Sequence, residues 1–345
     1  FGFSCMGYEI AAGWGHAMAK GGAKGTGGTP IVMLGDGTYM MMNSDIYSTV
    51  LSGHKMIVII CDNGGYAVIS RLQQFKGVPN LSFPGIKIFA DGVMEFPGQT
   101  AAVLDPFKNS LKRGELLIDP ANFGQLVAAA EKRDWIVHMH AVGDRAVRET
   151  LNGVEYARKL NPTPMPHSIS HLQLVNPKEF PRFKQLGVIA SMQLLWATAE
   201  SYTEELVKPY VSAMTYQYQY PARSLHKAGA TIAGASDWPV SSPNPWNAIA
   251  QASTRKGPLG VLNSAESIDR ESMFYAYTLN AAKALRLDQQ IGSLAPGKQA
   301  DLIVLDRDVF KVSDSELFDT QVLETFFAGK SVYRAEATPA VAQAQ

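Results

Sequence analysis

The sequence predicts an α/β fold in which parallel strands alternate with helices, followed by a small β appendage. Short apolar runs recur along the chain, helical stretches separate them, and Gly, Asp, Asn or His residues follow the runs. This alternation is typical of βαβ units and a parallel sheet. Both a (β/α) barrel and a doubly wound sheet fit it, and in both the functional side chains lie at the carboxyl ends of the strands.

The first unit of this kind lies near the start of the chain. Residues 31–34 form an apolar run that ends in Gly35-Asp36-Gly37, and residues 56–61 form a second run that ends in Asp62-Asn63-Gly64-Gly65. A Met-rich helix is expected between them, at about residues 41–51. Strand, helix and strand at this spacing predict a βαβ unit.

The character of the sequence changes around residues 77–84, and strands and helices alternate again after it. A clear helix start is Asp119 followed by Pro120, because Asp suits the N-cap and Pro the first helical position. The expected strands of this part lie at residues 86–89, 135–140, 167–171, 188–193 and 231–236. The expected helices lie at about residues 119–133, 144–160 and 177–186. Two further strands, at residues 301–305 and 331–333, form the β appendage.

Composition excludes several functions. Hydrophobic residues make up 46% of the chain and charged residues 18%, which indicates a folded globular protein. Basic and acidic residues both number 31, so no net charge favours nucleic acid or an anionic membrane. The sequence has no apolar run of about 20 residues and no signal-peptide pattern. Cys5 and Cys61 fit buried thiols in a reducing compartment. We therefore expect a cytoplasmic protein that acts on a small-molecule substrate.

Histidines at strand ends are the strongest chemical signal. His138 and His140 lie two apart on one strand and face the same side, His171 ends the next strand, and Asp237 ends a later one. In a β/α barrel these strand ends meet at one mouth, where imidazoles and a carboxylate suit zinc or a similar divalent metal. We expect His140, His171 and Asp237 to be catalytic, with Asp237 accepting a proton from a metal-bound water that attacks a carbonyl. His138 is expected to pack beside the site. The alternative is that these histidines are hydrogen-bonded core residues.

Five motifs occur in an order that resembles the amidohydrolase superfamily, and most of all the branch that includes N-substituted formamide deformylases. They are Lys87-Ile88-Phe89-Ala90-Asp91-Gly92, His140-Ala141-Val142-Gly143-Asp144-Arg145-Ala146, Ser170-His171-Leu172-Gln173, Gly234-Ala235-Ser236-Asp237-Trp238-Pro239-Val240 and Gly292-Ser293-Leu294-Ala295-Pro296-Gly297-Lys298-Gln299-Ala300-Asp301-Leu302. The resemblance implies a (β/α) barrel of amidohydrolase type. It also implies Lys87, His140, His171 and Asp237 as metal-binding residues, with Lys87 carboxylated to bridge metals.

The chain departs from this family at one point. The family's first strand carries a His-x-His pair, and no such pair precedes Lys87 here. The first three β/α units and the opening part of the β-sandwich are also missing. We therefore expect an incomplete barrel, or one completed by N-terminal β/α units, and a single metal rather than two.

The N-terminal part resembles a different family. Gly35-Asp36-Gly37 with Asn63 is similar to the diphosphate-binding motif of thiamine-diphosphate enzymes, and the runs at residues 4–10 and 41–47 are similar to trihydroxycyclohexanedione hydrolase. The resemblance implies that Asp36 and Asn63, with a backbone oxygen near Gly65, hold the Mg²⁺ of thiamine diphosphate. The alternative is that these glycines form ordinary strand-to-helix turns.

These observations predict four parts: a thiamine-diphosphate-enzyme-like βαβ fragment at residues 1–80, a barrel portion at 81–288, a β-sandwich remnant at 289–335 and a disordered tail at 336–345. Two families in one chain suggest a chimera, and the chain opens at Phe1 as if inside a longer sequence. An open sheet would expose its edges. Our hypothesis is that the strands at residues 31–34 and 56–61 fill missing barrel positions, bringing Asp36, Asp62 and Asn63 to the mouth beside His140. Oligomerisation is the other way to cover the edges, and we also expect a homo-oligomer.

The function predicted from these features is a metal-dependent hydrolase of amide or ester bonds in small molecules. One alternative is a thiamine-diphosphate-dependent carbon–carbon hydrolase or lyase, and another is a non-catalytic metal-binding chimera. Four side chains near the strand ends are candidate pocket walls: Trp196, Tyr202, Arg223 and Trp238.

Overall fold

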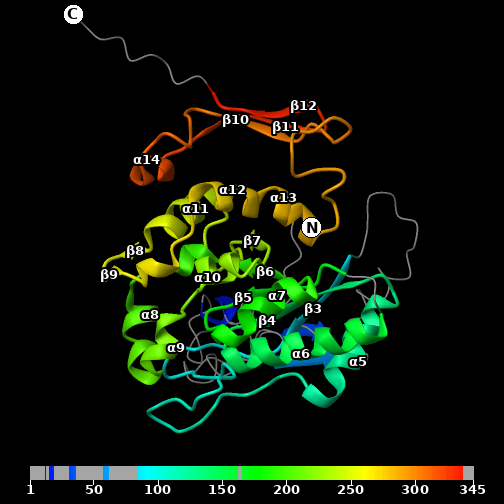
Figure 1. Cartoon of the computed structure of the whole chain (residues 1–345), viewed down its shortest axis with the longest axis vertical. Coiled ribbons are helices and arrows are strands. Elements are labelled where there is room, and N and C mark those ends of the chain that lie inside the picture. Colours follow the sequence, from blue (N-terminus) through cyan, green and yellow to red (C-terminus); the bar gives the residue numbers. More distant parts are fainter. Residues whose placement is uncertain are drawn as a thin grey trace, which may run out of the picture. The chain divides into compact units, whose positions relative to one another are not determined.

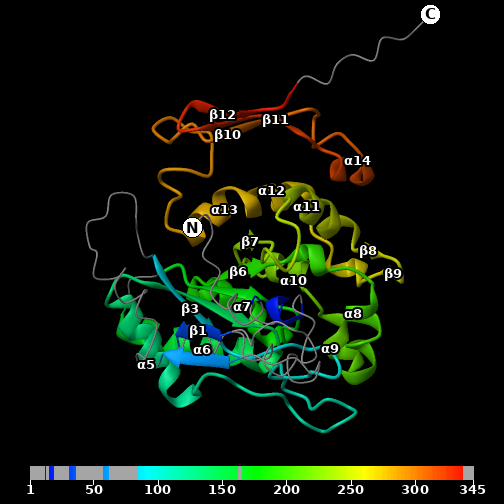
Figure 2. The same ribbon diagram turned by 180° about the vertical axis from the view of Figure 1, so that it is seen from behind.

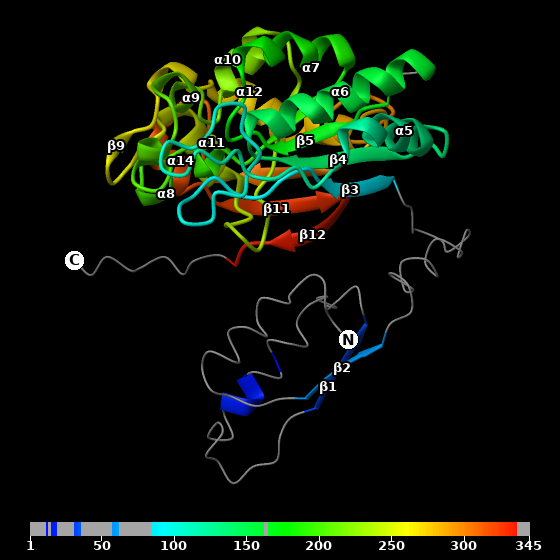
Figure 3. The same cartoon turned by 90° about the horizontal axis from the view of Figure 1, so that it is seen from below.

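The computed structural model describes residue 12 and residues 15–18, 31–35, 57–61, 84–161 and 165–336. The chain divides into two compact units, Phe1–Phe83 and Pro84–Gln345. In the first unit, β1 (Ile31–Gly35) and β2 (Ile57–Cys61) pair in parallel along their whole length, with Ile31 opposite Ile57 (Figure 3). This pairing agrees with the βαβ interpretation of the sequence.

β1 and β2 form a two-stranded sheet of their own. The five-stranded sheet of the second unit is built from other strands, so the hypothesis that residues 31–34 and 56–61 fill barrel positions is wrong. Asp36, Asp62, Asn63 and Gly65 lie outside the described residues, so their proposed part in cofactor binding stays a prediction.

The second unit is built on a parallel sheet with the order β3-β4-β5-β6-β7 (Figure 1). Its strands are β3 (Gly85–Phe89), β4 (Ile136–Ala141), β5 (Ser168–His171), β6 (Ile189–Met192) and β7 (Ile232–Gly234). Strands consecutive in the sequence are neighbours in space, as in a β/α barrel. Within the described part of the chain β3 and β7 remain the two edges, so this is the incomplete form of the predicted barrel.

Helices α5 (Pro120–Glu131), α6 (Asp144–Leu160) and α7 (Phe180–Leu186) lie on one face of this sheet (Figures 1 and 3). The α5 start is as predicted, because the Asp119 side chain accepts a hydrogen bond from the Ala121 N–H at 3.1 Å. α5 and α6 pack closely: a Cβ added to Gly153 would lie 2.3 Å from the Phe123 ring. Glycine at this position therefore sets the distance between the two helices.

The chain after β5 alternates short helices with loops (Figure 2). These elements are η2 (Pro177–Glu179), η3 (Leu194–Trp196), α8 (Ser201–Glu204), η4 (Lys208–Tyr210), α9 (Ala213–Gln217), α10 (Ala222–Lys227), α11 (Pro245–Thr254), η5 (Ser264–Glu266), α12 (Arg270–Tyr277) and α13 (Leu279–Ala284). β8 (Lys256–Gly257) and β9 (Gly260–Val261) pair in antiparallel fashion and form a short hairpin. None of the helices in the described ranges has the length and apolar character that crossing a membrane requires.

The C-terminal appendage is an antiparallel sheet of β10 (Leu302–Leu305), β11 (Val322–Phe327) and β12 (Lys330–Arg334), with α14 (Asp314–Phe318) between the first two strands. The predicted strands at residues 301–305 and 331–333 correspond to β10 and β12. The sequence analysis missed β11, the central strand.

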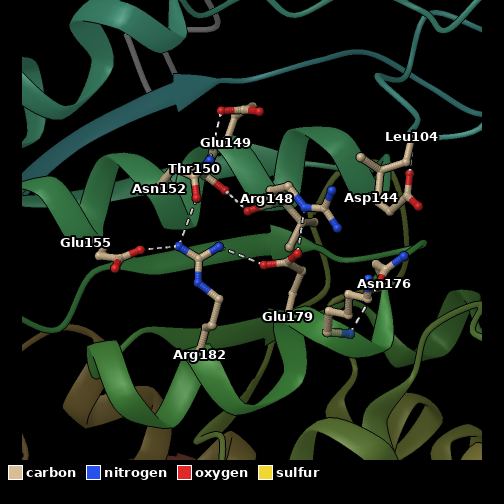
Figure 4. Close-up of polar contacts among 12 residues, drawn as sticks. Leu104, Asp144, Arg148, Glu149, Thr150, Asn152, Glu155, Asn176, Glu179 and Arg182 are labelled. Atoms are coloured by element: carbon tan, nitrogen blue, oxygen red, sulfur yellow. Dashed lines mark hydrogen bonds and ion pairs between the residues drawn. The ribbon is translucent and has the colours of Figure 1, made fainter.

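Buried ion pairs attach α7 to α6 (Figure 4). Glu179 is 3% exposed and accepts hydrogen bonds from Arg148 and Arg182, both at 2.7 Å. Arg182 also contacts Glu155 at 2.7 Å. Because every charge in this group has a partner, the group can lie between the helices without an uncompensated buried charge.

A second buried polar group fixes β5 against β4 and α5. The His167 Nδ1 accepts a hydrogen bond from the Val137 N–H at 2.9 Å, so its Nε2 carries the ring hydrogen and donates it to Glu131, also at 2.9 Å. Arg158 forms an ion pair with the same carboxylate. His167 is fully buried, and burial lowers its pKa. The part that it plays in the described structure is therefore structural.

Candidate metal centre

Two predicted site histidines meet at the carboxyl ends of β4 and β5. In the sheet register Ala141 lies opposite His171, which brings His171 next to the end of β4. The centroids of the His140 and His171 rings are 4.4 Å apart, with the rings edge to face. Both side chains are buried. The structure thus brings together the two imidazoles that the sequence predicted.

The His140 ring has a fixed orientation. Its Nε2 lies 3.0 Å from the Gly92 carbonyl oxygen and 3.6 Å from Asp91 Oδ1. A carbonyl only accepts, so Nε2 carries the hydrogen and Nδ1 keeps a free lone pair. Burial lowers the pKa of His140, which the hydrogen bond to Gly92 opposes. His140 is therefore held as a neutral imidazole, the form that binds a metal.

His171 has an unusual environment. Its backbone φ is 76°, in the left-handed region, and its side chain is 5% exposed. The Nδ1 atom is buried and has no hydrogen-bond partner, while the ring stacks on Trp196 at 5.5 Å. Burial lowers the pKa of His171 to about 3, and the neighbouring His140 adds to this effect. An unpartnered buried polar atom costs about 1–3 kcal/mol, so a ligand to this nitrogen would be stabilising.

Lys87 approaches the histidines from the edge strand β3. Its Nζ donates a hydrogen bond to Ser170 Oγ at 2.9 Å, and the Ser170 hydroxyl donates to the Met139 carbonyl at 3.1 Å. Burial lowers the pKa of Lys87, and the charge of Asp237 raises it. A lowered pKa makes the neutral amine more accessible, and the neutral amine is the form that can be carboxylated, as the family resemblance implies.

Asp237 is exposed, and its backbone φ of 56° is also left-handed. Its charge acts on the pKa values of both Lys87 and His140, so it lies on their side of the sheet. Within the described ranges, however, no three His, Cys, Asp or Glu side chains lie together as a metal site. The two imidazoles can supply two nitrogen ligands to one ion, and Asp237 is not grouped with them as a third ligand.

His138 lies beside the site as expected. Its Nδ1 is 2.7 Å from Ser168 Oγ, and burial lowers its pKa to about 4, with Lys87 contributing to the shift. His16 and His226 are exposed. His226, in the second unit, therefore does not belong to the group of buried imidazoles at the strand ends.

Asp91 organises the loops around His140 and was not singled out in the sequence. It is 1% exposed and accepts three backbone hydrogen bonds, from Ala102 and Val142 at 2.9 Å and from Gly143 at 2.8 Å. Burial raises its pKa to about 7, which these three bonds oppose. The signal available in the sequence was an Asp-Gly pair directly after a strand, which is also an ordinary turn signal.

The second unit contains a cavity of about 640 Å³ whose lining residues include no histidine. Trp196, which stacks on His171, forms part of its wall. Tyr202 also lines it, as predicted, whereas Arg223 and Trp238 are not among its lining residues. The lining residues are Val93, Glu95, Leu195, Trp196, Thr198, Glu200, Tyr202, Thr203, Tyr220, Val240, Ser241 and Gln251. Its size suits a small-molecule ligand.

Comparison with known proteins agrees with this architecture. The model of the Amidohydrolase family matches residues 11–333. The chain belongs to the amidohydrolase family. The protein LONG AFTER FAR-RED 3 of Arabidopsis thaliana is 30% identical over 302 residues, which cover 84% of this chain and 50% of that protein. The N-substituted formamide deformylase of Arthrobacter pascens is 26% identical over 258 residues, 71% of this chain and 44% of that protein.

The same fold occurs in a solved structure, an uncharacterized metal-dependent hydrolase from Pyrococcus horikoshii OT3. It matches with a TM-score of 0.61 and 24% identity, over 79% of this chain and 55% of that one. This amidohydrolase-family chain spans about half the length of the curated relatives it matches. The predicted amidohydrolase resemblance is confirmed.

The second predicted resemblance is also found. The 3D-(3,5/4)-trihydroxycyclohexane-1,2-dione hydrolase of Clostridium botulinum (strain Eklund 17B / Type B) is 38% identical over 82 residues. These cover 24% of this chain and 12% of that protein. The chain is therefore similar to two different kinds of enzyme, and the second similarity covers a small part of the enzyme it matches.

Proposed function

We propose that this amidohydrolase-family chain hydrolyses amide or ester bonds in small molecules and uses one divalent metal, of the zinc type, held by His140 and His171. One observation carries the proposal: the two imidazoles meet at neighbouring strand ends beside a cavity, and one of them keeps a buried nitrogen without a partner. Family membership supports the reaction class.

The chain's own residues would divide the work. A bound ion would supply an activated water and polarise the carbonyl. Gly92 orients His140, and the stack on Trp196 fixes the plane of His171. Asp237, three residues after the end of β7, would accept the proton of the attacking water. Lys87, as a carbamate or through its neutral amine, would complete the ligand set.

The deciding experiment measures metal content and hydrolysis together. We expect about one zinc-type ion per chain in the purified protein, and loss of the ion in His140→Ala and His171→Ala. His226→Ala, which removes an exposed imidazole, is the matched control and should keep it. A panel of small amides and esters then tests turnover. Wild-type protein that neither binds zinc nor hydrolyses any member of the panel would refute the proposal.

A second candidate function rests on the N-terminal similarity to trihydroxycyclohexane-1,2-dione hydrolase. In it, Asp36 and Asn63 would hold Mg²⁺ and the diphosphate of thiamine diphosphate, and the reaction would act on a carbon–carbon bond. Titration with thiamine diphosphate and Mg²⁺, with Asp36→Ala as the control variant, tests this alternative. Absence of saturable binding by the wild type would exclude it. A chain that binds zinc without turnover would instead support a non-catalytic protein.

A further inference from the structure

The cavity beside His171 has a distinctive chemical character. Aromatic side chains line it, namely Trp196, Tyr202 and Tyr220, together with two carboxylates, Glu95 and Glu200. Its lining residues include no Lys, Arg or His. A cavity with acidic and aromatic walls attracts cations, because a carboxylate supplies charge and an aromatic face supplies a cation–π contact.

Neither carboxylate is neutralised by a neighbour in the described part of the chain. The ion pairs among the described residues include neither Glu95 nor Glu200. Buried Glu179, in contrast, pairs with two arginines. Burial raises the pKa of Glu95, and hydrogen bonds from its own backbone and from Gln173 oppose this. A cation in the cavity would stabilise the ionised form of Glu95.

Arg255, whose charge acts on Tyr220 of the cavity wall, already has hydrogen-bond partners. It is fully buried, and its guanidinium donates to the backbone carbonyls of Leu262 at 2.5 Å, Gln219 at 2.8 Å and Tyr220 at 3.1 Å. It does not line the cavity. An anionic substrate would therefore meet two carboxylates without a free cation on the wall, and the cavity disfavours it.

Trp196 links the cavity to the proposed metal site. It lines the cavity and also stacks on His171, whose Nδ1 is buried without a partner. Val240 and Ser241, three and four residues after Asp237, line the same space. A molecule in the cavity is therefore connected to His171 through Trp196, and to Asp237 through the segment that carries Val240 and Ser241.

We propose that this cavity selects substrates that carry a positively charged amine beside an apolar or aromatic group. The ammonium binds between Glu95 and Glu200, and the apolar part lies against Trp196. The substrate class is thus a cationic amino-amide or amino-ester. This inference rests on the proposed hydrolase function for the reaction, but not for the binding of the cation.

The test is an equilibrium binding series in which charge alone changes. The ligands are 3-phenylpropylamine, 3-phenylpropan-1-ol and 3-phenylpropanoate, titrated by calorimetry into the full chain at low and moderate salt. We expect the amine to bind about tenfold more tightly than the alcohol, and the carboxylate more weakly than either. Equal affinity for the amine and the alcohol would overturn the proposal.

Isosteric Glu→Gln variants locate the binding site. Glu95→Gln and Glu200→Gln should each reduce the preference for the amine several-fold, and the double variant should abolish it. Glu115→Gln removes the same charge from an exposed position outside the cavity and should leave the preference unchanged. An amine preference that persists in the double variant would place the cation elsewhere and refute the assignment.

Hydrolysis separates this proposal from the broader one. Two amides with the same acyl group, one N-(3-aminopropyl) and one N-propyl, are compared for kcat/KM in the zinc-loaded protein. Turnover of both at equal kcat/KM refutes the cationic substrate class and leaves the hydrolase function intact. Binding of the amine through Glu95 and Glu200 without turnover of any amide or ester supports the cation site and refutes the hydrolase function.

Discussion

The ion pairs that join α6 to α7 provide a sharp test of the structure. Glu179→Gln keeps the size of a 3%-exposed side chain and removes its charge. Two guanidiniums, those of Arg148 and Arg182, then lose their shared carboxylate. Breaking a fully buried ion pair costs about 3–5 kcal/mol. Arg148 is 32% exposed at its side chain, and Arg182 keeps Glu155, so we expect a loss of about 2–3 kcal/mol in unfolding free energy.

Glu155→Gln is the matched control, because its side chain is 46% exposed and it pairs with the same Arg182. An exposed pair contributes about 0–1 kcal/mol, so this variant should lie within that range of the wild type. Urea unfolding followed by tryptophan fluorescence measures both, since every tryptophan except Trp14 lies in the second unit. Equal losses in the two variants, or a Glu179→Gln loss below about 0.5 kcal/mol, would refute the reasoning from burial.

Three further predictions concern packing, pH and metal. Gly153→Ala should destabilise the protein by about 1–3 kcal/mol, because the added Cβ would overlap the Phe123 ring. This loss should exceed the gain from the better helix propensity of Ala. An unchanged urea midpoint would contradict the close contact between the two helices. The pKa of His167 is lowered in the folded protein, so below about pH 6.5 the unfolded chain binds a proton that the folded chain does not. As pH falls, the unfolding free energy of the wild type should therefore decrease more steeply than that of His167→Gln, by up to about 1.4 kcal/mol per pH unit. Parallel pH profiles of the two proteins would refute a neutral His167 ring bonded to Val137. Zinc added to metal-free protein should raise its Tm, and His171→Ala should lose this shift; an equal shift in both would show that zinc binds elsewhere.

Much of the second unit could be predicted from apolar runs alone. The run at residues 135–140 corresponds to β4, and the predicted cap Asp119 begins α5. The run at residues 231–236 is longer than β7, which ends at Gly234. The backbone leaves the strand there and reaches a left-handed φ at Asp237, a conformation that apolar periodicity does not encode. The strand β11 was missed because its sequence mixes polar and aromatic residues without clear alternation.

The site was predictable only in part, for a physical reason. Parallel strand ends share one edge, so the meeting of His140 and His171 follows from their positions in the sequence. The stack of Trp196 on His171 depends on the path of the irregular segment after β6, and no periodicity describes that path. Glu95 belongs to a loop whose route is likewise set by tertiary contacts. Sequence reasoning therefore found the paired imidazoles and missed the acidic wall of the cavity.

The contacts of Arg255 have a mechanical consequence. Its guanidinium donates hydrogen bonds to the backbone carbonyls of Gln219, Tyr220 and Leu262. Arg255 directly follows α11, so these bonds cross-link the end of α11 to the segments that carry the three carbonyls. Movement of these segments would break hydrogen bonds of the buried Arg255 guanidinium and leave its charge uncompensated, so we expect this part of the cavity wall to be rigid. Tyr202 and Val240 form a solvent-exposed rim of the cavity, since they line it and are 62% and 71% exposed. We expect molecules to enter and leave across this rim, so bulk added there should slow exchange and leave the inner wall undisturbed.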